Sequence, residues 1–249
     1  MTSSQNHREK GIFVTGTDTG VGKTVVAAGL VRLARKAGIC AIAVKPIETG
    51  CQVRSGALFP EDGAFLREAA ERHLSLDECV PFRFSLPASP ARAAAMEGRS
   101  LKISDVEEHV RALAEGADLT VVEGAGGLMV PIQDRLMMID LAERLGYPTL
   151  LVGRTRLGTL NHTLLSVTAL KERGMSVAGI VLSCSAPDTG PEEQFTAGDL
   201  ARLVEDVPVV VLPFLGPEVI GDADRIASII ASSWPAMLVK RWIGLEEDE

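Results

Sequence analysis

Several motifs that would mark other protein classes are missing from this sequence. It has no Cys-x-x-Cys pair, no metal-spaced Cys/His set, no His-Glu-x-x-His and no Gly-x-Ser-x-Gly. These absences argue against a structural zinc site, a zinc protease and an α/β-hydrolase. The cysteines are therefore expected to be reduced, mostly buried thiols of a cytoplasmic protein. They are Cys40, Cys51, Cys79 and Cys184.

Two kinds of residue run are also missing. No apolar run approaches the roughly 18 residues of a membrane span, and no Lys/Arg run is long enough to bind nucleic acid. The formal net charge is −8 and the pI is near 5.2, which disfavours DNA as a partner. We therefore predict no membrane and no nucleic-acid partner. Residues 1–10 are polar without an apolar segment, which predicts a disordered tail.

The remaining chain alternates short apolar runs with helical patterns. With 249 residues, 46% of them hydrophobic, it suits one large domain. Near-continuous apolar strands between helices predict an α/β fold, a mostly parallel sheet with helices on both faces, over residues 11–249. Strands are expected at 12–14, 39–44, 119–122, 149–152, 177–182 and 209–212. Helices are expected at 24–37, 61–72, 91–96, 104–114, 138–145, 160–173, 194–205 and 222–232.

Two local features refine this pattern. Ser104 followed by Glu107 predicts a capping box that opens the helix at 104–114. Residues 187–191 are expected to form a flexible stretch. No internal repeat or linker divides the chain.

The central motif spans residues 11–24 and reads Gly-Ile-Phe-Val-Thr-Gly-Thr-Asp-Thr-Gly-Val-Gly-Lys-Thr. A strand, a glycine-containing loop and a helix opening at Lys-Thr predict a phosphate cradle built from backbone N–H groups and a helix N-terminus. Lys23 is then expected to reach the β- and γ-phosphates, and the Thr24 hydroxyl to bind Mg²⁺. The usual spacing requires glycine where Thr17 stands, and Gly16 lies one place too early.

Three charged residues sit where a parallel sheet presents its ligands. Lys45 follows the strand at 39–44, at the carboxyl end where open sheets bind ligands, although a solvated lysine fits the position equally well. Glu123 follows the strand at 119–122 and precedes small residues, which resembles a Walker B carboxylate near Mg²⁺. Asp62, in the first turn of a helix, is by itself an ordinary capping residue.

Taken together, the motifs resemble the dethiobiotin synthetase family. They are Gly16-Thr-Asp-Thr-Gly-Val-Gly-Lys-Thr, Lys45-Pro46, Val122-Glu123-Gly-Ala-Gly-Gly and Leu157-Gly-Thr-Leu-Asn161-His162. The resemblance covers roughly residues 11–215 and implies a P-loop NTPase-like fold. The longer loop of this family accounts for the departure at Thr17. The family uses MgATP to phosphorylate the carbamate of 7,8-diaminopelargonic acid and CO₂, and then closes the ureido ring in biotin biosynthesis.

The resemblance implies roles for individual positions. Lys23, Lys45 and Thr19 would be catalytic, while Thr24, Asp62 and Glu123 would hold Mg²⁺. The nucleotide would contact Gly20, Val21, Gly22, Lys23, Thr24, Val25, Glu123, Gly124, Ala125, Gly126, Ser183, Pro213, Phe214 and Leu215. The substrate would contact Thr19, Lys45, Thr49, Gly158, Thr159, Leu160, Asn161 and Phe195. Family members are homodimers in which the substrate tail reaches the partner subunit.

Two positions depart from the family pattern. Some members carry an acidic residue where this chain has Gly20, so a role for that carboxylate is missing. An asparagine that reads adenine in well-studied members is replaced by Ser183, whose hydroxyl cannot make the paired contact of an amide. We therefore hypothesise relaxed base selectivity, with CTP or GTP competing with ATP.

Two alternatives compete with this interpretation. A cobyrinate-type amidotransferase synthetase shares a similar loop, but this chain is too short to hold the glutaminase domain of those enzymes. A partitioning or positioning switch ATPase would carry a second lysine early in the loop, where Asp18 stands. Such a protein would also bind DNA or membrane. The C-terminal Lys240, Arg241 and Trp242 could suit an anionic surface, but the acidic residues 246–249 would repel it.

Overall fold

The computed structural model describes residues 11–187 and 190–245. The tail expected at 1–10, part of the stretch expected to be flexible, and the acidic residues 246–249 lie outside these ranges. No helix among the described residues is long and apolar enough to cross a bilayer.

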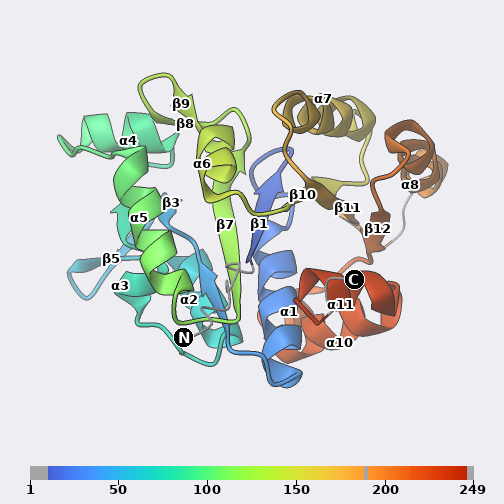
Figure 1. The fold of residues 1–249 in the computed structure, drawn as a ribbon, viewed down its shortest axis with the longest axis horizontal. Coiled ribbons are helices and arrows are strands. Elements are labelled where there is room, and N and C mark those ends of the chain that lie inside the picture. Colours follow the sequence, from blue (N-terminus) through green and yellow to red (C-terminus); the bar gives the residue numbers. More distant parts are fainter. Residues whose placement is uncertain (1–10, 188–189, 246–249) are drawn as a thin grey trace, which may run out of the picture.

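A six-stranded sheet forms the centre of the molecule, with the order β12-β11-β10-β1-β7-β2 and every neighbouring pair parallel (Figure 1). This confirms the predicted parallel sheet. The strands are β1 (Gly11–Gly16), β2 (Ala41–Val44), β7 (Leu119–Gly127), β10 (Thr149–Arg154), β11 (Val177–Ser183) and β12 (Val209–Leu212). The loop that follows β1, residues 17–22, is called the P-loop below. Because β1 lies between β7 and β10, this loop emerges at the middle of one sheet edge.

Helices cover both faces of the sheet, because alternate strand residues point in opposite directions. Ile12 and Val14 belong to one apolar cluster, whereas Phe13 belongs to another. The first face is covered mainly by α1 (Lys23–Lys36), α2 (Glu61–Ala69), α10 (Ala223–Ser233) and α11 (Ala236–Trp242). The second is covered by α4 (Pro90–Met96), α5 (Ile103–Ala114), α6 (Met138–Leu145), α7 (Thr159–Glu172) and α8 (Pro191–Val204).

Smaller elements lie beside this frame and were not predicted individually. They are β3 (Ile47–Thr49) paired with β6 (Phe82–Phe84), β4 (Gln52–Arg54) with β5 (Ala57–Phe59), β8 (Pro131–Gln133) with β9 (Leu136–Met137), and the short helices α3 (Leu76–Cys79) and α9 (Pro217–Ile220). The region between β2 and α5 is therefore more ordered than its proline-rich composition indicates. It forms one wall of the site described below.

Two local predictions were wrong. The capping box at Ser104 does not form, since α5 begins one residue earlier with Lys102 as its N-cap. The Ser104 hydroxyl instead donates to Asp105, and Glu107 accepts a hydrogen bond from Arg111. The helix expected at 61–72 ends at Ala69, because Glu71 and Arg72 take left-handed backbone angles.

The strand β7 also continues beyond its predicted end at residue 122, through Gly127. Small residues allow this close approach: a Cβ on Gly127 would lie 3.0 Å from the carbonyl oxygen of Gly16. Glu123 therefore lies inside a strand, paired in register with Val14.

The helix α11 was not predicted from the sequence, and it packs across the sheet face. The indole N–H of Trp242 donates to the carbonyl oxygen of Ala178 at 3.1 Å, and its ring stacks edge-on with Trp234. A Cβ on Gly179 would lie 2.5 Å from Trp242 Cζ2. The strand β11 therefore needs glycine where α11 lies against it.

Replacing Gly179 with alanine tests this packing. Because the rigid indole must shift, we expect Gly179→Ala to lower the free energy of unfolding by about 1–3 kcal/mol. Gly198, an exposed helical glycine with nothing within 4 Å of an added Cβ, is the matched control. Gly198→Ala should stabilise the protein by about 0.5–1 kcal/mol. Urea unfolding measures the stability of both variants. Equal effects of the two substitutions would contradict close packing of Trp242 against Gly179.

Candidate active site

The P-loop between β1 and α1 forms a compact turn at the centre of the site. Gly20 and Gly22 have φ angles of 69° and 101°, a region that favours glycine. The Lys23 ammonium folds back and donates to the carbonyl oxygen of Asp18 at 2.9 Å. Burial lowers the pKa of Lys23, so an anion placed in the loop would stabilise its charged form.

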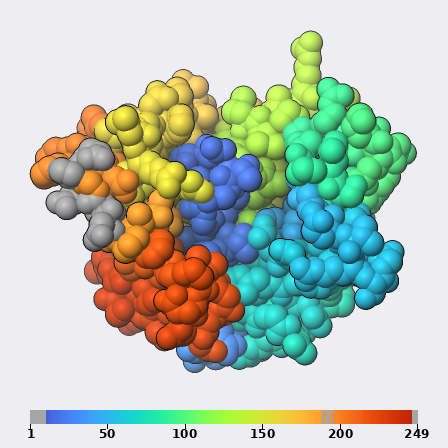
Figure 2. All heavy atoms as spheres, turned by 180° about the vertical axis from the view of Figure 1, so that it is seen from behind, coloured from blue at the N-terminus to red at the C-terminus, as the bar shows by residue number. Residues whose placement is uncertain are grey.

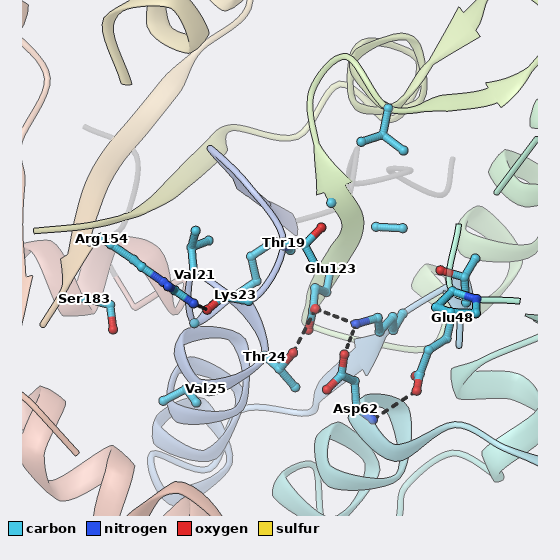
Figure 3. A pocket seen from close by; sticks show the side chains of 18 of the residues that line it. Thr19, Val21, Lys23, Thr24, Val25, Glu48, Asp62, Glu123, Arg154 and Ser183 are labelled. Carbon is cyan, nitrogen blue, oxygen red and sulfur yellow. Dashed lines mark hydrogen bonds and ion pairs between the residues drawn. The ribbon is translucent and has the colours of Figure 1, made fainter. Parts of the chain in front are cut away.

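Next to the loop, a buried ammonium group holds two carboxylates. Lys45 Nζ lies 2.8 Å from Glu123 Oε1 and forms a second ion pair with Asp62. The Thr24 hydroxyl donates to the same Glu123 oxygen at 2.9 Å. Figure 3 shows the side chains of Thr24, Asp62 and Glu123 converging from α1, α2 and β7. The predicted metal-binding residues and Lys45 therefore meet at one point.

Burial and charge act in opposite directions on this cluster. Burial disfavours the charge on Lys45, but the carboxylates of Glu123 and Asp62 outweigh that cost and raise the pKa of Lys45. The lysine is therefore a permanent cation at neutral pH. Glu48, which is also buried, has its pKa raised chiefly by burial.

These groups line a cavity of about 920 Å³, a size that suits small-molecule ligands. In Figure 2 the blue segment that contains the P-loop lies at the centre of this side, between the cyan and the orange-red segments. Most predicted site residues line the cavity: Thr19, Gly20, Val21, Gly22, Lys23, Thr24, Val25, Lys45, Thr49, Asp62, Glu123, Ala125, Gly126, Ser183, Phe214 and Leu215. A phosphate-binding loop, two lysines and a carboxylate pair thus share one pocket.

Comparison with known proteins identifies the family. The "AAA domain" family model matches residues 10–223. An ATP-dependent dethiobiotin synthetase BioD of Anaeromyxobacter dehalogenans (strain 2CP-1) is 45% identical over 223 residues, covering 90% of this chain and 98% of that protein. The protein of the same name from Pseudomonas aeruginosa (strain UCBPP-PA14) is 41% identical, covering 80% and 86%. The chain belongs to the dethiobiotin synthetase family.

Similarity to solved structures supports the fold of this chain but says nothing about its function. A ParA family ATPase from Chlorobium tepidum has a TM-score of 0.54 at 13% identity, covering 94% of this chain and 97% of that one. The septum site-determining protein MinD from Pyrococcus horikoshii has a TM-score of 0.52 at 19% identity, covering 95% and 91%. The P-loop NTPase-like fold is thereby confirmed. Because identity is so low, the likeness to partitioning and positioning ATPases extends to the fold alone.

The oxygen atoms of the dethiobiotin synthetase site fit Mg²⁺. Glu123 Oε2 is buried without a hydrogen-bond partner among the described residues, and Thr24 and Asp62 supply further oxygen donors of the kind that Mg²⁺ prefers. The described residues contain no group of three or more His, Cys, Asp or Glu side chains that could hold a metal. Such a site resembles those in which the metal shares its coordination with substrate phosphates.

Some predicted residues lie away from the cavity of this chain. Gly124 faces Phe13 and Met138, and Pro213 does not line the pocket. The predicted tail-binding residues form the N-terminus of α7 and part of α8, outside the cavity lining: Gly158, Thr159, Leu160, Asn161 and Phe195. Phe195 is 66% exposed and Leu157 95% exposed, so apolar side chains face solvent here.

The structure also adds cavity residues that the sequence analysis did not assign. Arg154, the last residue of β10, donates to the carbonyl oxygen of Gly20 at 2.5 Å. Its place at the carboxyl end of a strand is the same indication that pointed to Lys45. Glu48, Arg156 and residues 87–90 also line the pocket. Residues 87–90 do not follow a strand of the central sheet, so no sequence pattern indicated that tertiary folding would bring them to the cavity.

Removing the Lys45 cation should destabilise the protein in a pH-dependent way. Lys45→Met leaves Glu123 buried without its cation, so we expect a loss of about 3 kcal/mol near pH 7. Without the cation, a proton taken up by the buried cluster can replace part of the missing positive charge, so the deficit should shrink near pH 5.

Urea unfolding without added metal measures this deficit. Lys36→Met, which removes an exposed lysine paired with Asp224, is the matched control and should change stability little at either pH. A deficit that is absent, or that is equal at both pH values, would contradict the assignment of Lys45 as the compensating cation.

Proposed function

We propose that this chain uses ATP to join CO₂ to 7,8-diaminopelargonic acid and to close the ureido ring of dethiobiotin, a step of biotin biosynthesis. The main support for this proposal is the buried ammonium group of Lys45, which lies beside the P-loop. The chain that holds it is 45% identical, over 90% of its length, to an ATP-dependent dethiobiotin synthetase. Phosphoryl transfer needs positioned cations more than covalent chemistry from the protein. The cavity supplies them as Lys23 and Lys45.

The reaction divides into three balanced steps. One neutral amine of the substrate adds to CO₂ and loses a proton, which gives a carbamate. A carbamate oxygen attacks the γ-phosphorus of ATP, and ADP leaves, which gives a carbamic–phosphoric anhydride. The second amine attacks the carbonyl carbon, phosphate leaves with the bonding electrons, and the amine loses its proton as the ring closes.

Each step gives the chain's own residues a role. Lys45 neutralises the carbamate and then the phosphoryl group it receives, and Lys23 stabilises the charge on the γ-phosphate. Thr19 and Thr49 orient the diamine or its carbamate. The backbone N–H groups of residues 20–25 hold the phosphates.

Metal and base each have a proposed binding set. Thr24, Asp62 and Glu123 would hold Mg²⁺, which would neutralise phosphate charge during transfer. The nucleotide would lie along residues 123–126 and reach Ser183 and residues 213–215 with its base. Phe214 and Leu215 line the same cavity as Ser183.

A homodimer would complete the substrate site. The N-terminus of α7, where Gly158 and Asn161 are exposed, would bind the substrate carboxylate in the partner subunit through residues 158–161, because helix N-termini attract anions. Thr155 donates to Glu193 and so joins this loop to the start of α8. Phe195, exposed on that helix, would lie beside the aliphatic chain. We further propose that the residues from 11 onward act as one domain of a cytoplasmic enzyme.

Phosphate release by purified protein tests the function. With MgATP and bicarbonate, release should depend on 7,8-diaminopelargonic acid, and mass spectrometry should find dethiobiotin as the product. Lys45→Ala should lower the rate by about 100-fold or more, because the cation acts where charge develops. Lys36→Ala, a surface lysine of α1, should keep the full rate. Release that ignores the diamine would contradict the proposal.

Competition between nucleotides tests the role of Ser183. A Cβ on Gly22 would lie 3.2 Å from Ser183 Oγ, so this hydroxyl lies at the end of the P-loop. Since one hydroxyl discriminates bases weakly, kcat/KM for ATP should exceed that for CTP or GTP by less than roughly a hundredfold. Ser183→Asn should increase the preference for ATP and Ser183→Ala should leave it unchanged. A wild-type preference above that limit would exclude relaxed selectivity.

A further inference from the structure

Glu48 is a buried carboxylate that neither the sequence analysis nor the proposed reaction uses. It lies in the middle of β3 and is 6% exposed. Its two oxygens accept backbone hydrogen bonds from α2: Oε1 from the N–H of Asp62 at 3.2 Å, and Oε2 from the N–H of Gly63 at 2.9 Å. Figure 3 shows the Glu48 side chain reaching the helix turn that carries Asp62.

The helix α2 depends on this contact, since it has no cap of its own. The residue at its N-cap is Pro60, and no side chain caps the helix locally. The first N–H groups of a helix have no partner within it, and Glu48 satisfies two of them from a separate strand. Its negative charge also suits the helix N-terminus.

The first turn of α2 is held closely at this point. A Cβ on Gly63 would overlap the Val80 side chain and lie 3.4 Å from Glu48 Oε2. Packing therefore brings the backbone of α2 within reach of Glu48, and the two hydrogen bonds set where the turn begins.

Asp62 needs such a constraint more than the other proposed metal-binding residues. Its side chain is 49% exposed, whereas that of Glu123 is fully buried. Packing thus fixes Glu123, but it leaves Asp62 to be oriented by its backbone and by Lys45. The backbone N–H of Asp62 is one of the two groups that Glu48 holds.

We propose that Glu48 is a positioning residue for metal binding: it fixes the first turn of α2 and thereby directs the Asp62 carboxylate toward the ion shared with Thr24 and Glu123. This inference rests on the metal assignment in the proposed function. The Glu48 side chain thus links β3, which carries Thr49 at the proposed diamine site, to α2, which carries the proposed metal ligand Asp62.

Metal affinity, measured without turnover, tests this role. Electron paramagnetic resonance titration with Mn²⁺ and a non-hydrolysable ATP analogue gives the affinity of wild type, Glu48→Gln, Asp62→Ala and the double variant. The amide of glutamine presents a donor to a backbone donor, so one hydrogen bond is lost. We expect Glu48→Gln to weaken Mn²⁺ binding by about tenfold or more. In the Asp62→Ala background the same substitution should cause no further loss, because Glu48 acts through Asp62.

A matched control removes a carboxylate charge that also lies beside the first turn of α2. Glu61 precedes Asp62, has an exposed side chain and pairs with Arg54. Glu61→Gln should leave Mn²⁺ affinity unchanged. If Glu48→Gln does not fold, Glu48→Asp takes its place. It keeps the charge but is too short to reach both N–H groups, and the same weakening is expected.

Three results would overturn the inference. If Glu48→Gln lowers the melting temperature but leaves the Mn²⁺ affinity unchanged, then Glu48 only caps the helix. Losses that multiply in the double variant would mean that Glu48 acts independently of Asp62. Asp62→Ala with unchanged affinity would refute the metal assignment, while dethiobiotin formation by the wild type would still decide the proposed reaction separately.

Discussion

The ammonium group of Lys45 allows Glu123 and Asp62 to meet at one edge of the sheet. Glu123 is fully buried, and Lys45 nearly so, so neither could stay charged there alone. The strand order explains how they meet: β7 lies between β1 and β2. Within β7, Glu123 pairs with Val14 of β1 and directly follows Val122, the partner of Val44, so it lies level with Lys45 and beside the strand that leads into the P-loop. The two covered sheet faces supply the stability that this polar centre does not.

The cluster shows a balance between folding and function. A buried ion pair is weak support for a fold, and an apolar replacement of similar size is often as stable. Here the carboxylates keep Lys45 protonated, while Glu123 Oε2 is left without a partner among the residues described. The protein therefore holds a fixed cation and unused oxygen donors beside its phosphate loop, an arrangement that serves ligands rather than stability.

Much of the site follows from the sequence because parallel strands place their ends together. That rule placed the P-loop, Lys45 and Glu123 at one edge of the sheet, and the family resemblance turned these positions into a site and added Asp62. Arg154 would have followed from the rule too. Glu48 could not be found this way, because its partners lie fourteen and fifteen residues along the chain. The capping box at Ser104 failed because a distant residue acts at this helix start: the side chain of Gln133 accepts a hydrogen bond from the N–H of Ile103, the first residue of α5. The short helix α11 was missed because its burial depends on Trp242 meeting a distant strand.

Oxygen transfer from CO₂ to phosphate tests most directly whether this cation-lined pocket phosphorylates a carbamate. In a rapid single turnover with ¹⁸O-labelled CO₂, a labelled carbamate oxygen should attack ATP and leave on the phosphate. Our account predicts phosphate that carries ¹⁸O from CO₂, formed together with dethiobiotin. Phosphate without that label, with its new oxygen taken from water, would show simple ATP hydrolysis and would contradict the account.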